Sequence, residues 1–274
     1  MPWFPDFVAA VELARRQTRD TGLADPVAQY FTALQEGDAH SLESVWPGRV
    51  VIYDPRAGRV QGHRQLRRFV RRNRLWLGER GAKTESVAST CSGDRAVVEI
   101  LAHLAADDGS EVDWPLAVVA ESVDDRSVVF RTYCSQRPMV GEYRLRPAIL
   151  EPSQMDLNDV VGRYLVALRA GDIDDIVATF APDGYVREPL GPGYSYRGTL
   201  ELRSYFAKCF SGGGGIALEK CCVTDDGVRS ALEYNCVRWG TTDLAPQAGI
   251  AVFERGPDGL LAAVRTYDDV EPPV

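Results

Sequence analysis

Histidine is scarce in this chain, and no spacing of its residues suggests a metal centre. Only three of the 274 residues are histidine, which excludes a histidine-rich metal site. Six cysteines are present, but none are arranged as C-x-x-C. We therefore expect no metal ion and no cofactor, and we expect reduced, mostly buried thiols, as is usual in a cytoplasmic protein.

Long apolar runs and an excess of positive charge are absent too. No stretch is apolar over the roughly 20 residues that span a bilayer, so we expect no membrane segment. The first residues, Met-Pro-Trp-Phe-Pro-Asp, lack a basic region followed by an apolar one, and we expect no secretory signal. The net charge of −8 argues against nucleic acid and anionic membranes as partners.

What the sequence does contain is a long internal repeat at a constant offset of 134 residues. Residues 30–55 align without a gap on residues 164–189, and six aligned pairs are identical. These pairs are Tyr30/Tyr164, Ala33/Ala167, Leu34/Leu168, Gly37/Gly171, Asp38/Asp172 and Pro55/Pro189. The same offset pairs Glu99 with Glu233 and the Arg-Thr-Tyr triplet at 131–133 with that at 265–267.

A repeat of this length is the size of a domain, which predicts a tandem duplication of one fold. We place the two copies at residues 25–136 and 158–274. A helical extension over residues 1–24 precedes them, and a polar linker over residues 137–157 joins them.

Each copy is expected to hold helices first and strands afterwards. Apolar residues at helical spacing predict a helix pair at the start of each copy, with Gly37 and Gly171 ending the first helix. Asp38 and Asp172 are placed to cap the second helix of each pair. Further helices are predicted at 64–77 and 200–210. Long strands are predicted at 83–91, 95–105, 113–123 and 127–134, and at 216–224, 229–239, 247–254 and 260–267. This order is typical of an α+β fold.

The second copy carries a recognisable motif. The stretch GRYLVALRAGDIDDIVATFAPDG at 162–184, followed by Arg-Glu-Pro-Leu-Gly at 187–191, resembles bacterial ketosteroid isomerase. That enzyme belongs to the nuclear transport factor 2-like superfamily, which includes the SnoaL-type polyketide cyclases. The resemblance covers most of residues 158–270, and residues 25–135 follow the same pattern more weakly. It implies two tandem cone-shaped α+β barrels, each a curved antiparallel sheet packed on three helices around a deep apolar pocket.

The resemblance also implies which residues are catalytic. Asp54 and Glu188, each just before a proline, occupy the place of the family's general base. Tyr30 and Tyr164, each 24 positions earlier, occupy the place of the tyrosine that stabilises an oxyanion. From the dipeptide alone, an acid that only closes a turn is an equal alternative, and a tyrosine on an apolar helix face is usually part of the core.

The isomerase's second oxyanion group, a protonated aspartate, has no counterpart at the expected place. Neither residues 247–249 nor residues 114–118 contain an acid. We expect Glu99 and Glu233 to take over this role from the long strand of each copy.

The assignment of these glutamates rests on strand alternation, since successive side chains of a strand face opposite sides. Aligned on the preceding turn glycines, the inward set is Glu99, Leu101 and His103 in the first copy and Glu233, Asn235 and Val237 in the second. Ile100 and Tyr234 would then face away from the pockets. A shift of one residue would reverse both sets and put the glutamates on the solvent face.

Three further side chains are candidates for binding a substrate, namely Trp114, His103 and Arg197. His103 titrates near neutral pH, although a lone histidine on a strand is more often only packed. Arg197 either binds an anionic group or braces its loop. We expect the arginines of the helix at 64–77 to be solvated, and a surface for an acidic carrier protein is the alternative.

Two carboxylates in a dry pocket favour one protonated acid and one base. Tandem copies of this fold resemble the epoxide-opening cyclases of polyether antibiotic pathways. We therefore predict a cyclase or epoxide hydrolase that needs no cofactor and acts on a small apolar, polyketide-like intermediate. A double-bond isomerase and a non-catalytic binding or dimerisation module are the alternatives. The two copies are expected to pack as an internal pseudo-dimer, and a further homodimer is compatible with the sequence.

Overall fold

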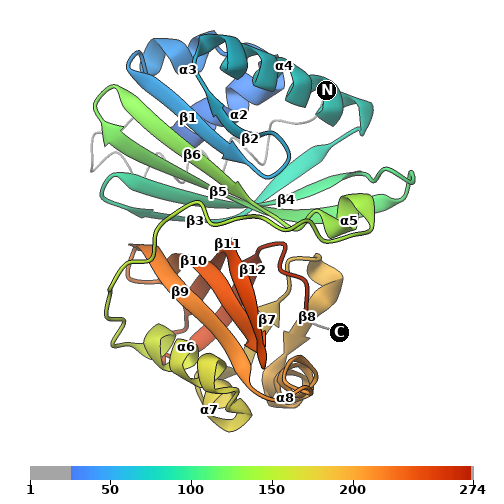
Figure 1. Ribbon diagram of the computed structural model, residues 1–274, viewed down its shortest axis with the longest axis vertical. Helices are drawn as coiled ribbons and strands as arrows, with labels where there is room; N and C mark the ends of the chain where they lie inside the picture. Colours follow the sequence, from blue (N-terminus) through green and yellow to red (C-terminus); the bar gives the residue numbers. More distant parts are fainter. Residues whose placement is uncertain (1–25, 273–274) are drawn as a thin grey trace. The chain divides into compact units, whose positions relative to one another are not determined.

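The computed structural model describes residues 26–272, so the extension over residues 1–24 lies outside the described residues. Contacts divide the chain into two units (Figure 1). One unit runs to Cys134 and includes Pro138–Val140, and the other comprises Ser135–Arg137 and the chain from Gly141 onward. The linker after Gly141 is therefore part of the second unit. No helix in the described part is long and apolar enough to cross a membrane.

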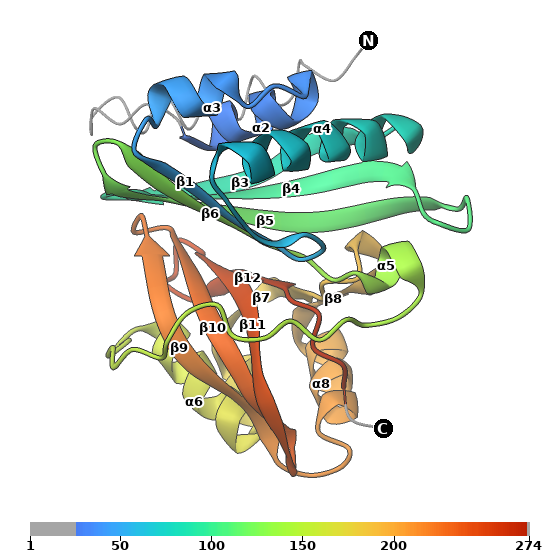
Figure 2. The ribbon, with the colours of Figure 1, turned by 45° about the horizontal axis from the view of Figure 1, so that its top comes forward.

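The described part of the first unit packs three helices on one face of a six-stranded sheet (Figure 2). The helices are α2 (Pro26–Glu36), α3 (His40–Val45) and α4 (His63–Glu79). The strands are β1 (Arg49–Asp54), β2 (Gly58–Gln61), β3 (Lys83–Ser92), β4 (Arg95–Ala105), β5 (Glu111–Asp124) and β6 (Ser127–Tyr133). The strand order is β2-β1-β6-β5-β4-β3, and only the β1–β6 pair is parallel.

The second unit repeats this arrangement after a short helix, α5 (Arg137–Val140). Its helices are α6 (Val160–Ala170), α7 (Ile173–Ala178) and α8 (Gly198–Cys209), with a 3₁₀ turn, η1, at Pro192–Tyr194. Its strands are β7 (Phe180–Arg187), β8 (Ser195–Arg197), β9 (Gly215–Asp225), β10 (Arg229–Gly240), β11 (Thr242–Arg255) and β12 (Leu261–Tyr267). They pair in the order β8-β7-β12-β11-β10-β9, with β7 parallel to β12.

The identical strand orders confirm the predicted α+β fold in two tandem copies. Two details differ from the expectation. Each sheet is mixed, not wholly antiparallel, because the strand after the helix pair joins the last strand of its copy in the same direction. Each sheet is also open, since its first and last strands in the pairing order are not joined into a barrel.

The helix ends follow from local chemistry. Gly37 and Gly171 end α2 and α6 with φ of 70° and 75°, a backbone conformation that favours glycine. Asp172 caps α7 as predicted, by accepting a 3.0 Å hydrogen bond from a backbone N–H three residues on. Asp38 bonds instead to the backbone N–H two residues on, and the residue after it holds the cap position of α3.

The apolar core of each unit fills the space between its helices and its sheet. Side chains such as Leu42 and Phe130 in the first unit, and Leu202 and Phe253 in the second, are completely buried there. The six arginines of α4 between residues 64 and 74 are exposed, whereas Leu66, Phe69 and Val70 are buried. A carrier protein at this arginine-rich surface stays a prediction.

Asp159 anchors the start of the second unit's first helix. One of its carboxylate oxygens accepts hydrogen bonds from the backbone N–H groups of Val161 (3.0 Å) and Gly162 (3.3 Å), which leaves α6 with an ordinary N-cap. Its other oxygen accepts the Arg255 side chain, with Nε at 3.0 Å.

We expect Asp159→Ala to destabilise the second unit by about 1 kcal/mol or more, because the substitution removes the cap and leaves Arg255 without one of its partners. Asp159→Asn should cost much less, since asparagine also caps helices well. Denaturant unfolding of both variants and the parent measures this, and an equal loss in the two variants would show that the cap contributes little.

Candidate active site

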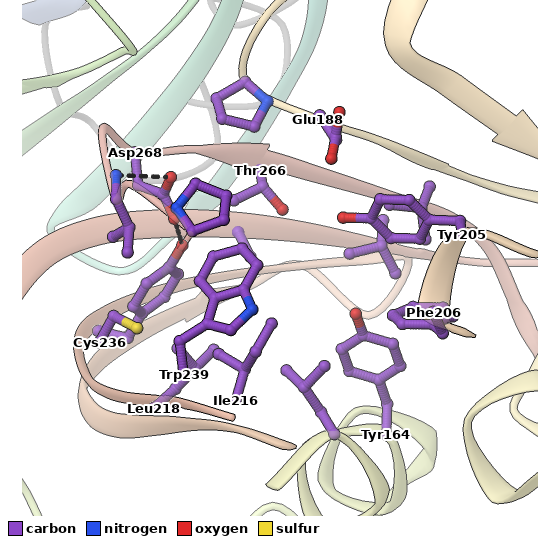
Figure 3. Close-up of a pocket in the computed structure, with 18 of the residues that line it drawn as sticks. Tyr164, Glu188, Tyr205, Phe206, Ile216, Leu218, Cys236, Trp239, Thr266 and Asp268 are labelled. Atoms are coloured by element: carbon purple, nitrogen blue, oxygen red, sulfur yellow. Dashed lines mark hydrogen bonds between the residues drawn. The ribbon is translucent and has the colours of Figure 1, made fainter. Parts of the chain in front are cut away.

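A cavity of about 80 Å³ lies in the second unit between the sheet and helices α6 and α8 (Figure 3). Ligand pockets usually hold roughly 300 Å³ or more, so this cavity suits a small molecule or the end of a larger one. Most of its wall is apolar. The polar side chains in the wall are those of Tyr143, Tyr164, Glu188, Tyr205, Tyr234, Trp239, Cys236, Thr266 and Asp268.

Glu188 reaches this cavity from the end of β7, where Pro189 keeps the preceding backbone extended. Its carboxylate points into the cavity (Figure 3). Burial raises the pKa of Glu188 above its usual value, although the hydroxyls of Tyr205 and Tyr196 lower it in part. A carboxylate of this kind is a stronger base than one in water.

Tyr164 enters the same cavity from α6, and its hydroxyl is directed toward the interior (Figure 3). Its ring is held edge-on by Phe180, Phe206 and Phe253, with centroid distances of 5.9, 6.4 and 5.5 Å. Burial raises the pKa of Tyr164. The phenol is therefore neutral at ordinary pH and can donate a hydrogen bond to a substrate oxygen. The structure thus brings together Glu188 and Tyr164.

A second acid in this cavity, Asp268, was missed at the sequence level. It follows β12 directly and accepts a hydrogen bond from the hydroxyl of Tyr234 (Figure 3). Burial raises the pKa of Asp268 to about 6, and the nearby charge of Glu188 contributes to the rise. The available signal was its place after the repeated Arg-Thr-Tyr triplet, two residues beyond Thr266 and so on the same side of the chain.

The structure does not bring Glu233 or Asn235 to the cavity. Tyr234 and Cys236 line it instead, so the expected alternation was wrong by one residue. Asn235 lies on the other face of β10 and donates a 3.0 Å hydrogen bond to the linker carbonyl of Leu150. Both faces of β10 are buried, with Glu233 2% and Tyr234 3% exposed, and a strand buried on both faces carries no information on register.

The register also shifts within β10, between Cys236 and Arg238. Val237 lies at this irregularity and is not part of the cavity wall, contrary to the expectation. Beyond it, Trp239 faces the cavity. The shift interrupts the alternation along the strand, as a bulge does.

The first unit has a cavity at the corresponding place, also of about 80 Å³. Tyr30, Asp54 and Trp114 line it, so these three predicted residues meet in one site. Glu99 and Leu101 do not line it, because Ile100 and Ala102 hold the inward positions of β4. The one-residue error is the same as in β10, for the same reason: both faces of most of β4 are buried.

His103 and Arg197 lie outside both cavities. The half-exposed ring of His103 is 2.6 Å from the carboxylate of Asp113. Arg197 braces its loop, the alternative that the sequence left open. Its guanidinium donates to the backbone carbonyl of Asp183 (2.8 Å) and stacks on Tyr185.

Two segments beyond the repeated motif close the second unit's cavity. Tyr143 contributes from the linker, and residues from 268 to 272 contribute from the C-terminal end. Asp269 ties these segments together, because its carboxylate accepts hydrogen bonds from the hydroxyl of Ser135 (2.6 Å) and the backbone N–H of Arg144 (2.8 Å). The neighbours of this buried link, Asp268 and Tyr143, are thereby fixed at the cavity wall.

The described residues contain no group of three or more histidine, cysteine, aspartate or glutamate side chains arranged to hold a metal ion. The polar groups of the cavity wall are carboxyls, phenols, a hydroxyl, a thiol and an indole.

Comparison with known proteins identifies the family. The model of the SnoaL-like domain matches residues 27–130 and again residues 161–264. The chain therefore belongs to the SnoaL-like family and carries two copies of its domain.

Solved structures resemble single copies of this domain. A putative polyketide cyclase from Sinorhizobium meliloti is 24% identical, over 41% of this chain and 96% of its own, with a TM-score of 0.34. SalBIII, an epoxide hydrolase/cyclase-like enzyme of pyran ring formation in salinomycin, is 21% identical over 39% and 86% of the two chains, with a TM-score of 0.34. A protein of ketosteroid isomerase-like fold from Catenulispora acidiphila is 12% identical over 43% and 90%, with a TM-score of 0.35.

The buried carboxyl of Asp268 predicts a pH-dependent stability. Its pKa in the folded protein, about 6, lies above the ordinary value of 3.8, so its contribution to stability is complete below about pH 4 and is lost as the pH rises through 6. We expect Asp268→Asn to be stabilised relative to the parent above pH 6, by on the order of 2 kcal/mol, and to lose this advantage near pH 4. Denaturant unfolding of both proteins between pH 4 and 8 measures the difference. A difference that does not change with pH would contradict the assignment.

Gly249 leaves room for the ring of Tyr234, because the two residues are paired across β10 and β11 and glycine has no side chain. A Cβ atom on Gly249 would lie 2.6–2.7 Å from ring atoms and the hydroxyl of Tyr234. We expect Gly249→Ala to displace the phenol, which removes the hydrogen bond to Asp268 and raises the pKa of that carboxyl further. Titration of Asp268 by carbon NMR follows the change. In a Tyr234→Leu background, Gly249→Ala should cost much less stability than it does in the parent, and an equal cost in the two backgrounds would show that the clash lies elsewhere.

Proposed function

We propose that the second unit is an acid–base catalyst that needs no cofactor and acts as a cyclase or epoxide hydrolase on a small apolar intermediate of natural-product biosynthesis. The observation that carries this proposal is the pair Glu188 and Asp268, two carboxyls facing one apolar cavity with raised pKa values. Two interacting acids in a dry site release their protons in separate steps, so an intermediate pH leaves one as base and the other as acid.

In the epoxide reaction, Glu188 removes the proton from an attacking hydroxyl or water. The new C–O bond forms as the C–O bond of the epoxide breaks. Asp268 gives its proton to the epoxide oxygen, and the two carboxyls then exchange protons through solvent. Each transfer lowers the charge that develops on an oxygen in the transition state, and the cavity wall fixes which carbon is attacked.

The neighbours of the two acids support this division of roles. Tyr234 donates its hydrogen bond to Asp268 and holds that carboxyl in a single orientation. Tyr205 and Tyr196 do the same for Glu188 and favour its charged form. The base is therefore the carboxylate with more phenol donors, and the acid is the one whose pKa rises to about 6.

A double-bond isomerase is the second candidate, favoured by a different observation. Tyr164 and Asp268 both face the cavity, and a buried phenol with a protonated carboxyl is the donor pair that stabilises the enolate in ketosteroid isomerase. In that reaction Glu188 would move a proton from one carbon to another, and no C–O bond would change.

We expect Glu188→Gln to lower turnover ~100-fold or more in either reaction, because the substitution keeps the shape and removes the base. Asp268→Asn should lower turnover by a similar factor on an epoxy-alcohol and abolish the fall in rate that the parent shows above about pH 6. Asp54→Asn in the first unit serves as the matched control and should leave this rate unchanged.

Assays on a small epoxy-alcohol and on a β,γ-unsaturated ketone distinguish the two reactions. Product from the first alone supports the cyclase, and product from the second alone supports the isomerase. If Asp54→Asn loses turnover and Glu188→Gln keeps it, catalysis belongs to the first unit. If binding of either compound occurs without any turnover, the second unit is a binding module.

A further inference from the structure

The cavity of the first unit differs from that of the second in its polar groups. At the positions of Tyr234 and Asp268, the offset of 134 residues places Ile100 and Cys134, so this cavity lacks the second acid and its donor. Its own polar wall includes Gln35 and Arg56. The equivalent residues of the second unit are Arg169 and Leu190. The two copies therefore present different chemistry from the same place in the fold.

Gln35 is among the residues that line this cavity, and its amide is buried without a partner in the described part of the chain. Neither its Nε2 nor its Oε1 has a hydrogen bond within the described part of the chain, and both atoms are inaccessible to water. A buried polar group left unpaired costs roughly 1–3 kcal/mol, so a donor and an acceptor at one site indicate a missing hydrogen-bonding group. Arg169, the counterpart in the second unit, is exposed and does not line that unit's cavity.

Arg56 supplies positive charge to the same wall. Its guanidinium lies 3.7 Å from the centre of the Trp76 ring and donates a 3.0 Å hydrogen bond to the side-chain oxygen of Asn73. These contacts fix the plane of the guanidinium and leave other N–H groups to bind an anion. Arg80 also stacks on Trp76, but it is paired with Asp107 at 2.6 Å and its charge is balanced.

The carboxylate of Asp54, close to Arg56 in the chain, is hydrogen-bonded to the local backbone. One carboxylate oxygen of Asp54 accepts hydrogen bonds from the backbone N–H groups of Arg56 (2.9 Å) and Ala57 (2.7 Å). It therefore closes the turn between β1 and β2, the alternative that the sequence left open. Its negative charge is near enough to Arg56 to act on the pKa of that arginine, and it opposes any anion that binds there.

We propose that the first unit's cavity is a binding site for a small ring-bearing carboxylate that also carries a hydroxyl or carbonyl group. The carboxylate accepts hydrogen bonds from Arg56 at the mouth, and the ring lies against the apolar wall that includes Trp114. A rotation of the Gln35 side chain lets its amide pair with the second polar group. A cavity of about 80 Å³ holds part of such a molecule, with the charged end outside.

This site is independent of the catalytic proposal for the second unit. It makes the first unit a receptor for an acid rather than a second copy of the catalyst, and either proposal can fail without the other.

Isothermal titration of the full chain with 3-hydroxybenzoate and 4-hydroxybenzoate, against 3-hydroxybenzyl alcohol as the neutral match, tests the proposal. We expect at least one of the acids to bind at least tenfold more tightly than the alcohol. Arg56→Gln should remove that difference. Arg59→Gln, which changes an exposed arginine on the same hairpin that does not line the cavity, should preserve it.

Two further variants separate binding from folding. Gln35→Leu should weaken binding of the hydroxybenzoate yet leave the unliganded chain as stable as the parent or more so, because the substitution removes an unpaired amide. Asp54→Asn should tighten binding, since it removes a negative charge near Arg56 and keeps the oxygen that closes the turn. Equal affinity for the acids and the alcohol, no binding of either acid, or an equal loss in Arg56→Gln and Arg59→Gln would overturn the proposal.

Discussion

The hydrogen bond from Tyr234 to Asp268 holds together the strands that form the cavity wall of the second unit. The donor stands in the middle of β10 and the acceptor follows β12, while β11 runs between these strands and carries Gly249 opposite the phenol. Three strands must therefore keep their register for one contact to form. The hydrogen bond gives the buried carboxyl of Asp268 a side-chain donor, which holds the carboxyl in one orientation. It lowers the pKa of Asp268 only in part, so the pKa stays above that of an exposed aspartate. The result is a carboxyl that can hold its proton close to neutral pH, in the same cavity as the carboxylate of Glu188.

The two copies show how one scaffold can carry unlike sites. Their strand orders are identical, and a tyrosine of the first helix and an acid before proline line the cavity in each. The differences lie in side chains at equivalent positions. Asp268 and Tyr234 of the second unit correspond to Cys134 and Ile100 of the first. The apolar Leu190 of the second unit corresponds to Arg56 of the first. None of these exchanges disturbs the sheet, because each alters only what the wall presents to the cavity. The fold thus determines where a ligand sits, and a few positions determine what it can be.

The sequence predicted where helices and strands lie better than it predicted which side of a strand faces the cavity. Strand ranges such as 95–105 and 229–239 agree with β4 and β10 to within a residue, because turn glycines and apolar runs mark where a strand begins and ends. The sequence could not show which side of β10 faces the helices, because Glu233 and Tyr234 are both buried. An alternation of apolar and polar residues marks the inner face only when the other face of the strand is exposed to solvent. The hydrogen bond that Asp268 accepts could not be predicted for another reason. Its partner is 34 residues away on another strand, and only the folded sheet brings the two together.

The link made by Asp269 has a consequence for inheritance. A duplicated gene begins with two self-sufficient copies, and the stretch between them is free to drift. Here that stretch supplies Tyr143 to a cavity wall, while Ser135 and Arg144 hold the far end of the chain. The connector is therefore part of the wall of the second unit's cavity. A segment of residues 158–274 alone would lack Tyr143 of the cavity wall and the hydrogen-bond partners of Asp269, so the second copy of the domain is not self-contained.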